Sequence, residues 1–452
     1  MSAISPATVR ATPTSSRAVS LSRAGKLFLA VFLIIVFEGS VRKWVSSAST
    51  LPLILLRDML ALMMVVYAWR HGHLRRHRKI TAAMLAWTCV VVGWGLLQLV
   101  GGQSTPVVFV IGLRFWLLYI WFAVAAAAAM NEADYRAALM AAALVMLLLA
   151  PLAVLQHYSP PGARINTQID GDEESVFVAV VGVVRTTGTF SFTSGYATYL
   201  TMVAPLVFGI LGARKRSQFQ FLFAIAVFVA FVTGALVSGS RTAAITSAGM
   251  LAAYLLGRLL FSKARNKIGA ALAVIVAGGL TALFAYVFRE AIGVTQTRFE
   301  QASAAENFVE RVLTVLFGEP WVLDLISWLG YGVGFGSNLA TYVRTGSADV
   351  FALAEAEGGR ILMEGGLLGF AYIAVKYLVL ALGVMRSLKI SVNTNSPYPL
   401  LVWLTTALAV VSWPALGQLT ANALLGLMLA YALLVFRYPR LEIFPPRSPQ
   451  RP

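Results

Sequence analysis

Two arginines beside long apolar runs are the residues of this sequence best suited to chemistry on an anion. Arg241 lies in the polar stretch 238–242, between two apolar runs, and Arg185 opens a similar stretch before another run. A guanidinium, hydroxyls such as that of Ser240 and the free N–H groups of a helix N-terminus together make a good oxyanion site. The alternative for each arginine is structural: it extends to water or pairs with an acid.

A second group of charges could supply a general base. Glu355, Glu357, Arg360 and Glu364 lie close together in the chain. Glu357, Arg360 and Glu364 recur at i, i+3 and i+7, so they share one helical face. One carboxylate could accept the proton of a hydroxyl, with Arg360 fixing its orientation. The alternative is that Glu357 and Arg360 only neutralise each other.

A third cluster surrounds the first connection between apolar runs. Glu38 lies near the end of one run, and Arg57 and Asp58 lie near the start of the next. A structural ion-pair cluster is the favoured interpretation, and Arg57 is its member best placed to contribute to a phosphate site. Arg114, inside another run, needs a buried partner because an isolated charge there is costly.

Composition identifies the class of protein. The chain has 452 residues, of which 59% are hydrophobic and only 12% charged, with a mean hydropathy of +0.77. This describes an integral membrane protein. The net charge of +17 does not indicate nucleic-acid binding, because the basic residues form short clusters between apolar runs. The single cysteine, Cys89, excludes an intrachain disulfide, and we expect no metal or cofactor.

The apolar runs predict an all-α, polytopic fold with about twelve transmembrane helices. Most Lys and Arg residues fall in alternate connections, which predicts that both termini are cytoplasmic. We expect a disordered tail over 1–22, a membrane domain over 23–440 and a second tail over 441–452. The predicted spans are 25–45, 51–69, 80–100, 107–130, 134–157, 190–212, 218–238, 241–260, 268–288, 351–385, 397–415 and 419–437.

Two long connections, 158–189 and 289–350, fall on the outer side. Residues 308–316 and 321–329 have apolar positions at helical spacing, so we expect two short amphipathic helices on the outer surface of the membrane that the chain spans. The glycine-rich segment 330–336 lacks the Lys-Ser or Lys-Thr of a nucleotide loop. Its glycines let the backbone turn or approach another group closely.

Four short motifs carry a resemblance to a known family. They are the stretch from Arg185 to Phe190, the stretch 238–242, the segment 332–336 at the end of the second long connection, and residues 364–369. In this order they resemble the O-antigen ligase and polysaccharide polymerase family of bacterial inner membranes, whose members are glycosyltransferases of the GT-C type. The resemblance covers roughly residues 180–370 by motif and the whole chain by topology.

The resemblance implies an activity and a location. Members transfer a glycan from an undecaprenyl pyrophosphate carrier to an acceptor hydroxyl on the periplasmic face of the inner membrane, without a metal. Arg185 and Arg241 would hold the pyrophosphate. Ligases carry a His-Asn-like pair nine residues before the glutamate that matches Glu364, whereas this chain has Glu355 and Ala356. The exopolysaccharide polymerase branch is therefore the closer match.

The expected function is polymerisation of lipid-linked oligosaccharide repeat units. Its partners would be the undecaprenyl pyrophosphate-linked oligosaccharide and membrane lipid, with a chain-length regulator and export proteins as further candidates. Two alternatives stay open. One is ligase-type transfer of the glycan to another acceptor. The other, from a different class, is transport of a lipid-linked oligosaccharide or solute.

Overall fold

The computed structural model describes residues 21–167, 184–261, 267–289, 293, 308–346, 354 and 356–445, and these ranges are helical with short connections. Most of the predicted N-terminal tail, the candidate Glu355 and the last seven residues lie outside the described residues.

The helices follow the apolar runs. The chain order is α1 (Arg23–Trp44), α2 (Thr50–Arg70), α3 (His73–Arg76), α4 (Arg78–Val100), α5 (Pro106–Leu113), a π-helical turn (Arg114–Leu118), α6 (Tyr119–Ala129), α7 (Glu132–Tyr158), α8 (Thr193–Gly212), α9 (Gln218–Val237), α10 (Arg241–Phe261), α11 (Lys267–Val287), α13 (Phe308–Phe317), α14 (Val322–Leu325), α15 (Asn338–Thr345), α16 (Glu357–Gly365), α17 (Leu367–Thr394), α18 (Tyr398–Ser412) and α19 (Leu419–Arg437).

The predicted fold class is confirmed: this is an all-α, polytopic membrane protein. In the described part of the chain, ten helical segments are long and apolar enough to cross a bilayer. The other two predicted spans coincide with α11 and α18, whose apolar helical stretches are shorter. Each of the twelve predicted runs therefore contains a helix.

The predicted span 351–385 is wrong at both ends. The long helix α17 begins at Leu367 and continues to Thr394, and the separate helix α16 precedes it. Gly366 breaks the helix with φ 54° and ψ −122°. A side chain there would lie 2.3 Å from the Trp328 carbonyl oxygen, so only glycine fits this break.

Of the two predicted amphipathic helices, the first is present and the second is much shorter. The first is α13, which spans the predicted 308–316. The second, α14, has only four residues, and the chain then continues without helix to Ser337. Trp321, Leu325 and Trp328 of the apolar pattern are exposed, whereas Val322 between them is buried, so the pattern does not correspond to one buried helical face.

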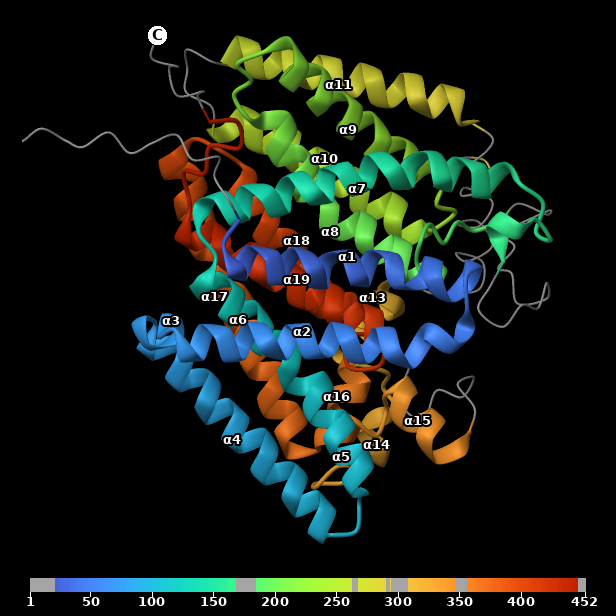
Figure 1. Cartoon of the computed structure of the whole chain (residues 1–452), viewed down its shortest axis with the longest axis vertical. Coiled ribbons are helices and arrows are strands. Elements are labelled where there is room, and N and C mark those ends of the chain that lie inside the picture. The colour runs from blue at the N-terminus through green and yellow to red at the C-terminus, as the bar shows by residue number, and fades with distance from the viewer. Residues whose placement is uncertain are drawn as a thin grey trace, which may run out of the picture.

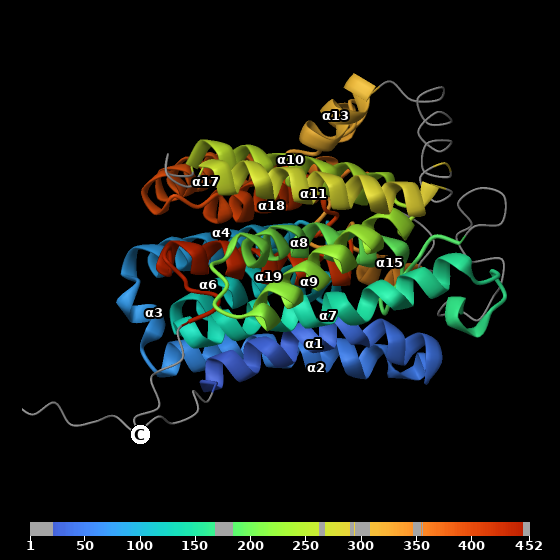
Figure 2. The same cartoon turned by 90° about the horizontal axis from the view of Figure 1, so that it is seen from above.

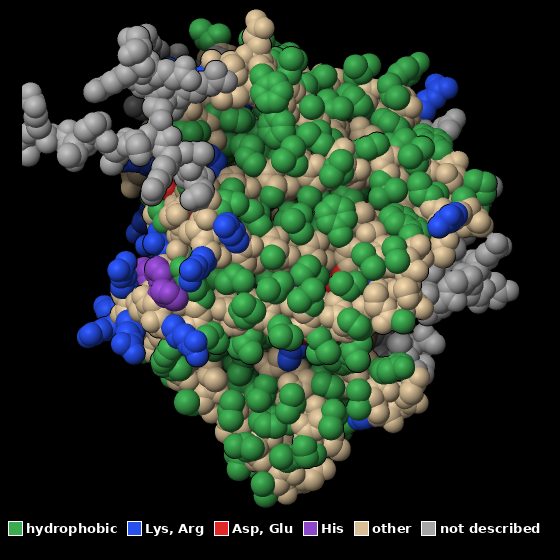
Figure 3. Space-filling view, in the orientation of Figure 1, with side chains coloured by type: hydrophobic (Ala, Val, Ile, Leu, Met, Phe, Trp, Pro, Cys, Tyr) green, Lys and Arg blue, Asp and Glu red, His purple; other side chains and the backbone are tan. Residues whose placement is uncertain are grey.

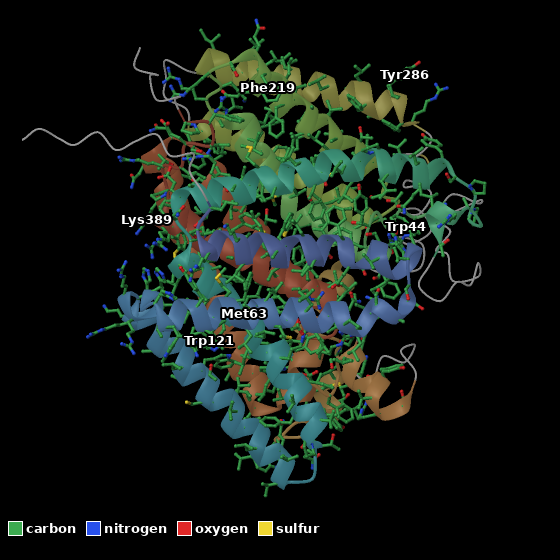
Figure 4. All side chains as sticks on the ribbon, in the orientation of Figure 1. Trp44, Met63, Trp121, Phe219, Tyr286 and Lys389 are labelled. Atoms are coloured by element: carbon green, nitrogen blue, oxygen red, sulfur yellow. The ribbon has the colours of Figure 1, made fainter. Side chains whose placement is uncertain are left out.

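The long helices run side by side in a layered bundle, with α1 and α2 on one side and α10, α11, α17 and α18 on the other (Figures 1 and 2). Trp44 and Lys389 mark its two ends (Figure 4). We call them the loop end, which contains 185–192, 238–240, 330–336 and 413–418, and the basic end, which contains Arg70, Arg214, Lys389 and Arg437. Lys, Arg and His side chains gather at the basic end, while apolar side chains cover the middle of the face seen in Figure 3.

Polar contacts close the basic end and extend the folded domain beyond its predicted limit. Ser22 caps α1 and donates its hydroxyl to Asp134 at 2.6 Å. Arg136 donates to the backbone carbonyl of Glu442 at 2.8 Å, and Ile443 is buried. The predicted boundary at 440 is therefore too early, because the chain packs against the bundle at least as far as Ile443.

Candidate functional site

Arg185 and the stretch 238–242 meet in space, although 53 residues separate Arg185 from Ser238 in the numbering. Gly239 has φ +62°, and a side chain there would lie 3.4 Å from Cγ of Arg185. Both Arg185 and Arg241 are partly buried at the loop end. The turn needs glycine for its positive φ, and that turn places the aliphatic part of Arg185 against the start of α10.

The hydroxyls of the 238–242 stretch mainly build the turn. The Ser238 hydroxyl donates to the Ala235 carbonyl at 2.8 Å and accepts from the Ser240 N–H at 3.2 Å. The Ser240 hydroxyl oxygen accepts from the Ala243 N–H at 3.3 Å and so caps α10. Ser240 keeps its own O–H as a donor, so it caps the helix and can still contact an anion.

Arg241 is the cation with the least compensation at this site. Its guanidinium makes no ion pair or hydrogen bond with any residue that the structure describes. It also stands at the positive N-terminal end of α10, where the helix dipole disfavours a cation. An anion would be stabilised here by the guanidinium and by the first N–H groups of the helix.

The segment that follows Arg185 is fixed by groups from two other helices. Gln156 of α7 accepts from the Gly188 N–H at 2.7 Å, and Lys43 of α1 donates to the Thr187 hydroxyl at 2.8 Å and the Gly188 carbonyl at 2.9 Å. Thr189 donates to the Val36 carbonyl at 2.6 Å. The backbone that carries Arg185 is therefore held rigidly in place. The sequence analysis missed Gln156, a buried polar residue near the end of an apolar run.

His157 lies beside this half of the site. Its ring is close to the Val237 backbone, just before the 238–242 stretch. The side chain is buried, and Nδ1 has no hydrogen-bond partner within the described ranges. His157 is a candidate wall residue of the anion site.

The carboxylate half of the site lies on α16, which begins at Glu357. One Glu357 oxygen, Oε1, accepts from the Leu416 N–H at 2.7 Å, and the buried Oε2 has no hydrogen-bond partner among the described residues. Burial raises the pKa of the Glu357 carboxyl to about 7, although Arg360 opposes the shift. A carboxyl that titrates near neutral pH is suited to general-base catalysis.

Arg360 is buried next to Glu357 but does not neutralise it directly. Its Nε donates to the Ala354 carbonyl at 3.0 Å, and its guanidinium lies against Gly417. None of the ion pairs between described residues joins Arg360 to Glu357. Arg360 acts on the Glu357 carboxylate electrostatically at longer range, without a direct ion pair.

Glu364 is fully buried and engaged on both oxygens. Oε2 accepts from the Trp116 indole at 2.8 Å and the Gly334 N–H at 2.9 Å, and Oε1 accepts from the Gly336 N–H at 2.8 Å. The carboxylate thus pins the glycine-rich segment to α16. The glycine-rich segment approaches another part of the protein closely. A side chain at Gly112 of α5 would lie only 2.2 Å from the Val333 carbonyl of this segment. This geometry makes Glu364 a positioning residue.

Arg57 is fully buried and paired with acids. It donates to both oxygens of Glu38, at 2.6 and 2.7 Å, and its Nε is 3.5 Å from Asp58. Arg114 donates to Asp58 at 2.8 and 3.1 Å, which supplies the buried partner expected from the sequence. This Glu38–Asp58 network has two acids and two arginines, and it is also linked to α19 because Thr420 donates to Glu38 at 3.3 Å.

The connection between α18 and α19, residues 413–418, joins these groups. Leu416 binds Glu357, Gly417 faces Arg360, and Ser194 at the start of α8 donates to Gln418 at 3.5 Å. The connection thus reaches from the carboxylate half to the segment that follows Arg185. Sequence analysis gave it no role because it carries no charge. Pro414 and Gly417, close together between two apolar runs, were the available sequence signal for an irregular connection at this point.

Glu319 is another residue that the sequence analysis missed. It follows Gly318 at the end of α13 and accepts from the Ala356 N–H at 2.8 Å, just before α16. Glu319 therefore fixes the start of the helix that carries Glu357.

Two cavities lie away from these residues. One of about 500 Å³ is lined by Glu132, Asn393 and residues 437–441, and one of about 200 Å³ lies between α8, α10, α18 and the C-terminal segment. Both are at the basic end.

Neither a protein-family model nor a curated protein sequence matches this chain significantly. The arrangement of the described residues is therefore the basis for a functional assignment.

Proposed function

We propose that this protein is a polysaccharide polymerase that joins lipid-linked oligosaccharide units at the loop end of the bundle. The observation that carries the proposal is the meeting of Arg185 and Gly239, which gathers two arginines and the start of α10 at one place. Such a set of donors suits a pyrophosphate, which has several anionic oxygens. The positive-inside rule supports an orientation with the basic end in the cytoplasm. In the bacterial inner membrane proposed for this protein, the loop end then faces the periplasm.

The proposed reaction is a direct displacement. The oxygen of an acceptor sugar hydroxyl forms a bond to the anomeric carbon of the donor glycan. The bond from that carbon to the carrier pyrophosphate breaks, and its electron pair leaves with the pyrophosphate. The hydroxyl proton passes to Oε2 of Glu357. This path inverts the configuration at the anomeric carbon.

The other candidate residues have distinct roles in this scheme. Arg185 and Arg241 stabilise the charge that develops on the departing pyrophosphate, and the Ser240 O–H adds a donor. After Glu357 has released its proton to solvent, Arg360 stabilises the ionised carboxylate. Arg57 and Glu364 hold neighbouring segments in position. Glu355 adjoins Ala356 in the chain and is an alternative base.

The depth of the buried charges bears on the choice between catalysis and transport. Glu38, Arg57, Arg114 and Lys376 lie six to nine residues from the loop-end termini of their helices. At a rise of about 1.5 Å per residue this places them between about 9 and 14 Å from the loop end. The middle of a hydrocarbon core about 30 Å thick would be near 15 Å. Glu38 and Arg57, at about 9–11 Å, lie toward the loop end, as catalysis there requires. Arg114 and Lys376, at about 12–14 Å, lie close to the midplane, where a transporter would place its site.

Arginine substitutions test the proposal. Arg241→Ala and Arg185→Ala should each lower the rate of polymer formation by about 10²–10³, the typical loss for one preorganised donor to an oxyanion. Single lipid-linked repeat units should accumulate while protein abundance stays unchanged. The control is Arg344→Ala, which removes an exposed loop-end arginine that stacks on Phe335.

Polymer of normal length and amount from Arg241→Ala would overturn the proposal. Accumulation of repeat units on the cytoplasmic face would favour transport instead. Normal polymerisation with loss of glycan transfer to a different acceptor would indicate the ligase alternative.

A further inference from the structure

The cavity of about 200 Å³ at the basic end has no role in glycan transfer. It is formed where α8 ends, where α10 ends and where α18 begins, and the C-terminal segment covers one side. Its lining includes Arg214, Arg216, Arg258, Tyr254, Tyr398 and Glu442. Three arginines around a small cavity require an explanation beyond membrane topology, because topology alone does not make them converge.

The positive charge of this cavity is only partly compensated. Of the lining residues that the structure describes, Glu442 is the only acid, and it pairs with Arg216 at 3.3 Å. Arg216 is further committed to the Phe444 carbonyl at 3.3 Å. Arg214 has no ion pair within the described chain, and Nε of Arg258 is buried there without a hydrogen-bond partner.

Lys215 adds to this excess. It lies in the connection between α8 and α9, close enough to Arg258 for the two charges to interact. Burial, together with the nearby Arg258 guanidinium, lowers the pKa of the Lys215 ammonium to about 8. Lys215 thus adds a positive charge next to the cavity, and an anion in the cavity would be stabilised by it as well as by the arginines.

The walls of the cavity suit a ligand that is partly polar and partly apolar. Tyr254 and Tyr398 contribute phenol rings, and the Tyr398 hydroxyl is 2.6 Å from that of Tyr135. Phe208 and Phe444 are apolar lining residues. Close by on α10, Leu260 is 76% exposed on the outside of the bundle, where acyl chains would lie.

The size of the cavity limits the ligand. Sites for drug-sized molecules enclose about 300–1,000 Å³. A cavity of about 200 Å³ is below that range and holds a phosphate with its immediate substituents, but not a nucleotide sugar. Basic pockets between transmembrane helices at the cytoplasmic side commonly bind anionic lipid headgroups.

We infer that this cavity binds a phosphate group, and that its source is the headgroup of an anionic phospholipid. Arg214 and Arg258 supply donors that have no acidic partner among the described residues, and Arg216 holds the C-terminal segment as a wall of the cavity. The site is independent of the proposed glycan transfer. It does share elements with it, because α8 follows Arg185 and ends before Arg214, and α10 begins at Arg241 and contains Arg258 near its end.

Lipid binding to the purified full chain tests the inference. Phosphatidylglycerol should raise the Tm of the detergent-solubilised protein above its value in phosphatidylcholine, and native mass spectrometry should show a retained phosphatidylglycerol. In the double variant Arg214→Gln/Arg258→Gln, apparent affinity for phosphatidylglycerol should fall at least fivefold. The matched control Arg75→Gln/Arg76→Gln removes two exposed arginines from the same end and should bind like the wild type.

Equal loss of binding in both double variants would overturn the inference, because it would show diffuse attraction between the basic end and anionic lipid. No preference of the wild type for phosphatidylglycerol over phosphatidylcholine would also overturn it. If Arg214→Gln/Arg258→Gln folds poorly, Arg214→Lys/Arg258→Lys keeps the charge but lacks the planar fork. An intermediate affinity is expected for that variant, and wild-type affinity would contradict a specific phosphate contact.

Inorganic phosphate provides the second arm of the test. A phosphatidylglycerol effect that persists in excess inorganic phosphate supports a lipid headgroup as the source. If inorganic phosphate alone produces the full Tm shift in the wild type and not in Arg214→Gln/Arg258→Gln, the phosphate site stands but the lipid source is overturned.

Discussion

The loop end and the basic end both carry many arginines, but they place them differently. At the loop end, Arg57 and Arg360 are buried inside the bundle and contact acids, carbonyls or glycines. At the basic end, Arg75, Arg76 and Arg214 are exposed near the ends of helices. A charge at the centre of a span costs about 2.5–3.5 kcal/mol on insertion scales. The loop end accepts this cost, whereas the basic end largely avoids it.

The helices differ in the same way. At the loop end α16 and α17 are separated by the Gly366 break, and a π-helical turn begins at Arg114. Breaks and π-turns are frequent at functional sites because they redirect side chains. At the basic end the connections between described long helices are short, as at 130–131 and 213–217. Irregular backbone therefore accompanies the buried charges, which supports placing the reaction at the loop end.

The largest expected effect tests whether the loop end is reactive. Glu357→Gln should lower the rate of glycan transfer by about 10²–10⁴, the usual contribution of a general base. In the wild type the rate should rise about tenfold per pH unit below the Glu357 pKa of about 7 and level off above it, because only the ionised carboxyl accepts a proton. Transfer by the purified protein from a lipid-linked donor, measured between pH 5 and 9, checks both points.

A wild-type rate in Glu357→Gln would assign the base elsewhere, with Glu355 next to be tested. Because its folded-state pKa is raised, Glu357 contributes less to stability as pH rises from about 4.5 to 7. Activity and this contribution to stability should thus change in opposite directions.

The next largest effect is expected for the buried ion pair between Glu38 and Arg57. Glu38→Ala should destabilise the protein by about 3–5 kcal/mol, because it leaves the fully buried Arg57 without its main partner. Thermal unfolding in detergent measures the change. The double variant Glu38→Ala/Arg57→Met should recover much of the loss because no unpaired charge remains, and an equally unstable double variant would contradict this explanation.

A smaller effect tests the helix break. Gly366→Ala should destabilise by about 1–3 kcal/mol, since alanine must adopt a strained backbone conformation and meets the Trp328 carbonyl. Gly278→Ala in α11 is the control, because a side chain there contacts nothing within 4 Å. That control should be neutral or slightly stabilising. If both variants have the same Tm, the break at Gly366 is not a constraint on the fold.

The smallest effect is expected for the exposed pair at the basic end. Arg136 and Glu132 are 3.1 Å apart, and their side chains are 24% and 48% exposed. Glu132→Ala should change the free energy of unfolding by less than about 0.5 kcal/mol. A loss as large as that of Glu38→Ala would remove the energetic distinction between the two ends.

Sequence analysis predicted the fold well because apolar length determines where helices cross a membrane. The family resemblance also implied that Arg185 and Arg241 hold one pyrophosphate, which requires Arg185 and the 238–242 stretch to lie close together. Sequence analysis did not predict that Glu364 holds Gly334 and Gly336, or that Leu416 binds Glu357. Those contacts join backbone groups of uncharged segments to carboxylates 28 to 59 positions away, and no periodic pattern encodes them.

The course of α10 also relates this protein to the thickness of its bilayer. Arg241 and Arg258 are 17 residues apart in one continuous helix, which corresponds to about 26 Å. A typical hydrocarbon core is about 30 Å thick. In a thicker membrane, hydrophobic mismatch would therefore pull one of the two guanidinium groups toward the acyl chains. In a thinner membrane, both guanidinium groups would reach the interfacial region. Lipid chain length is thus a variable to which both ends of the protein respond together.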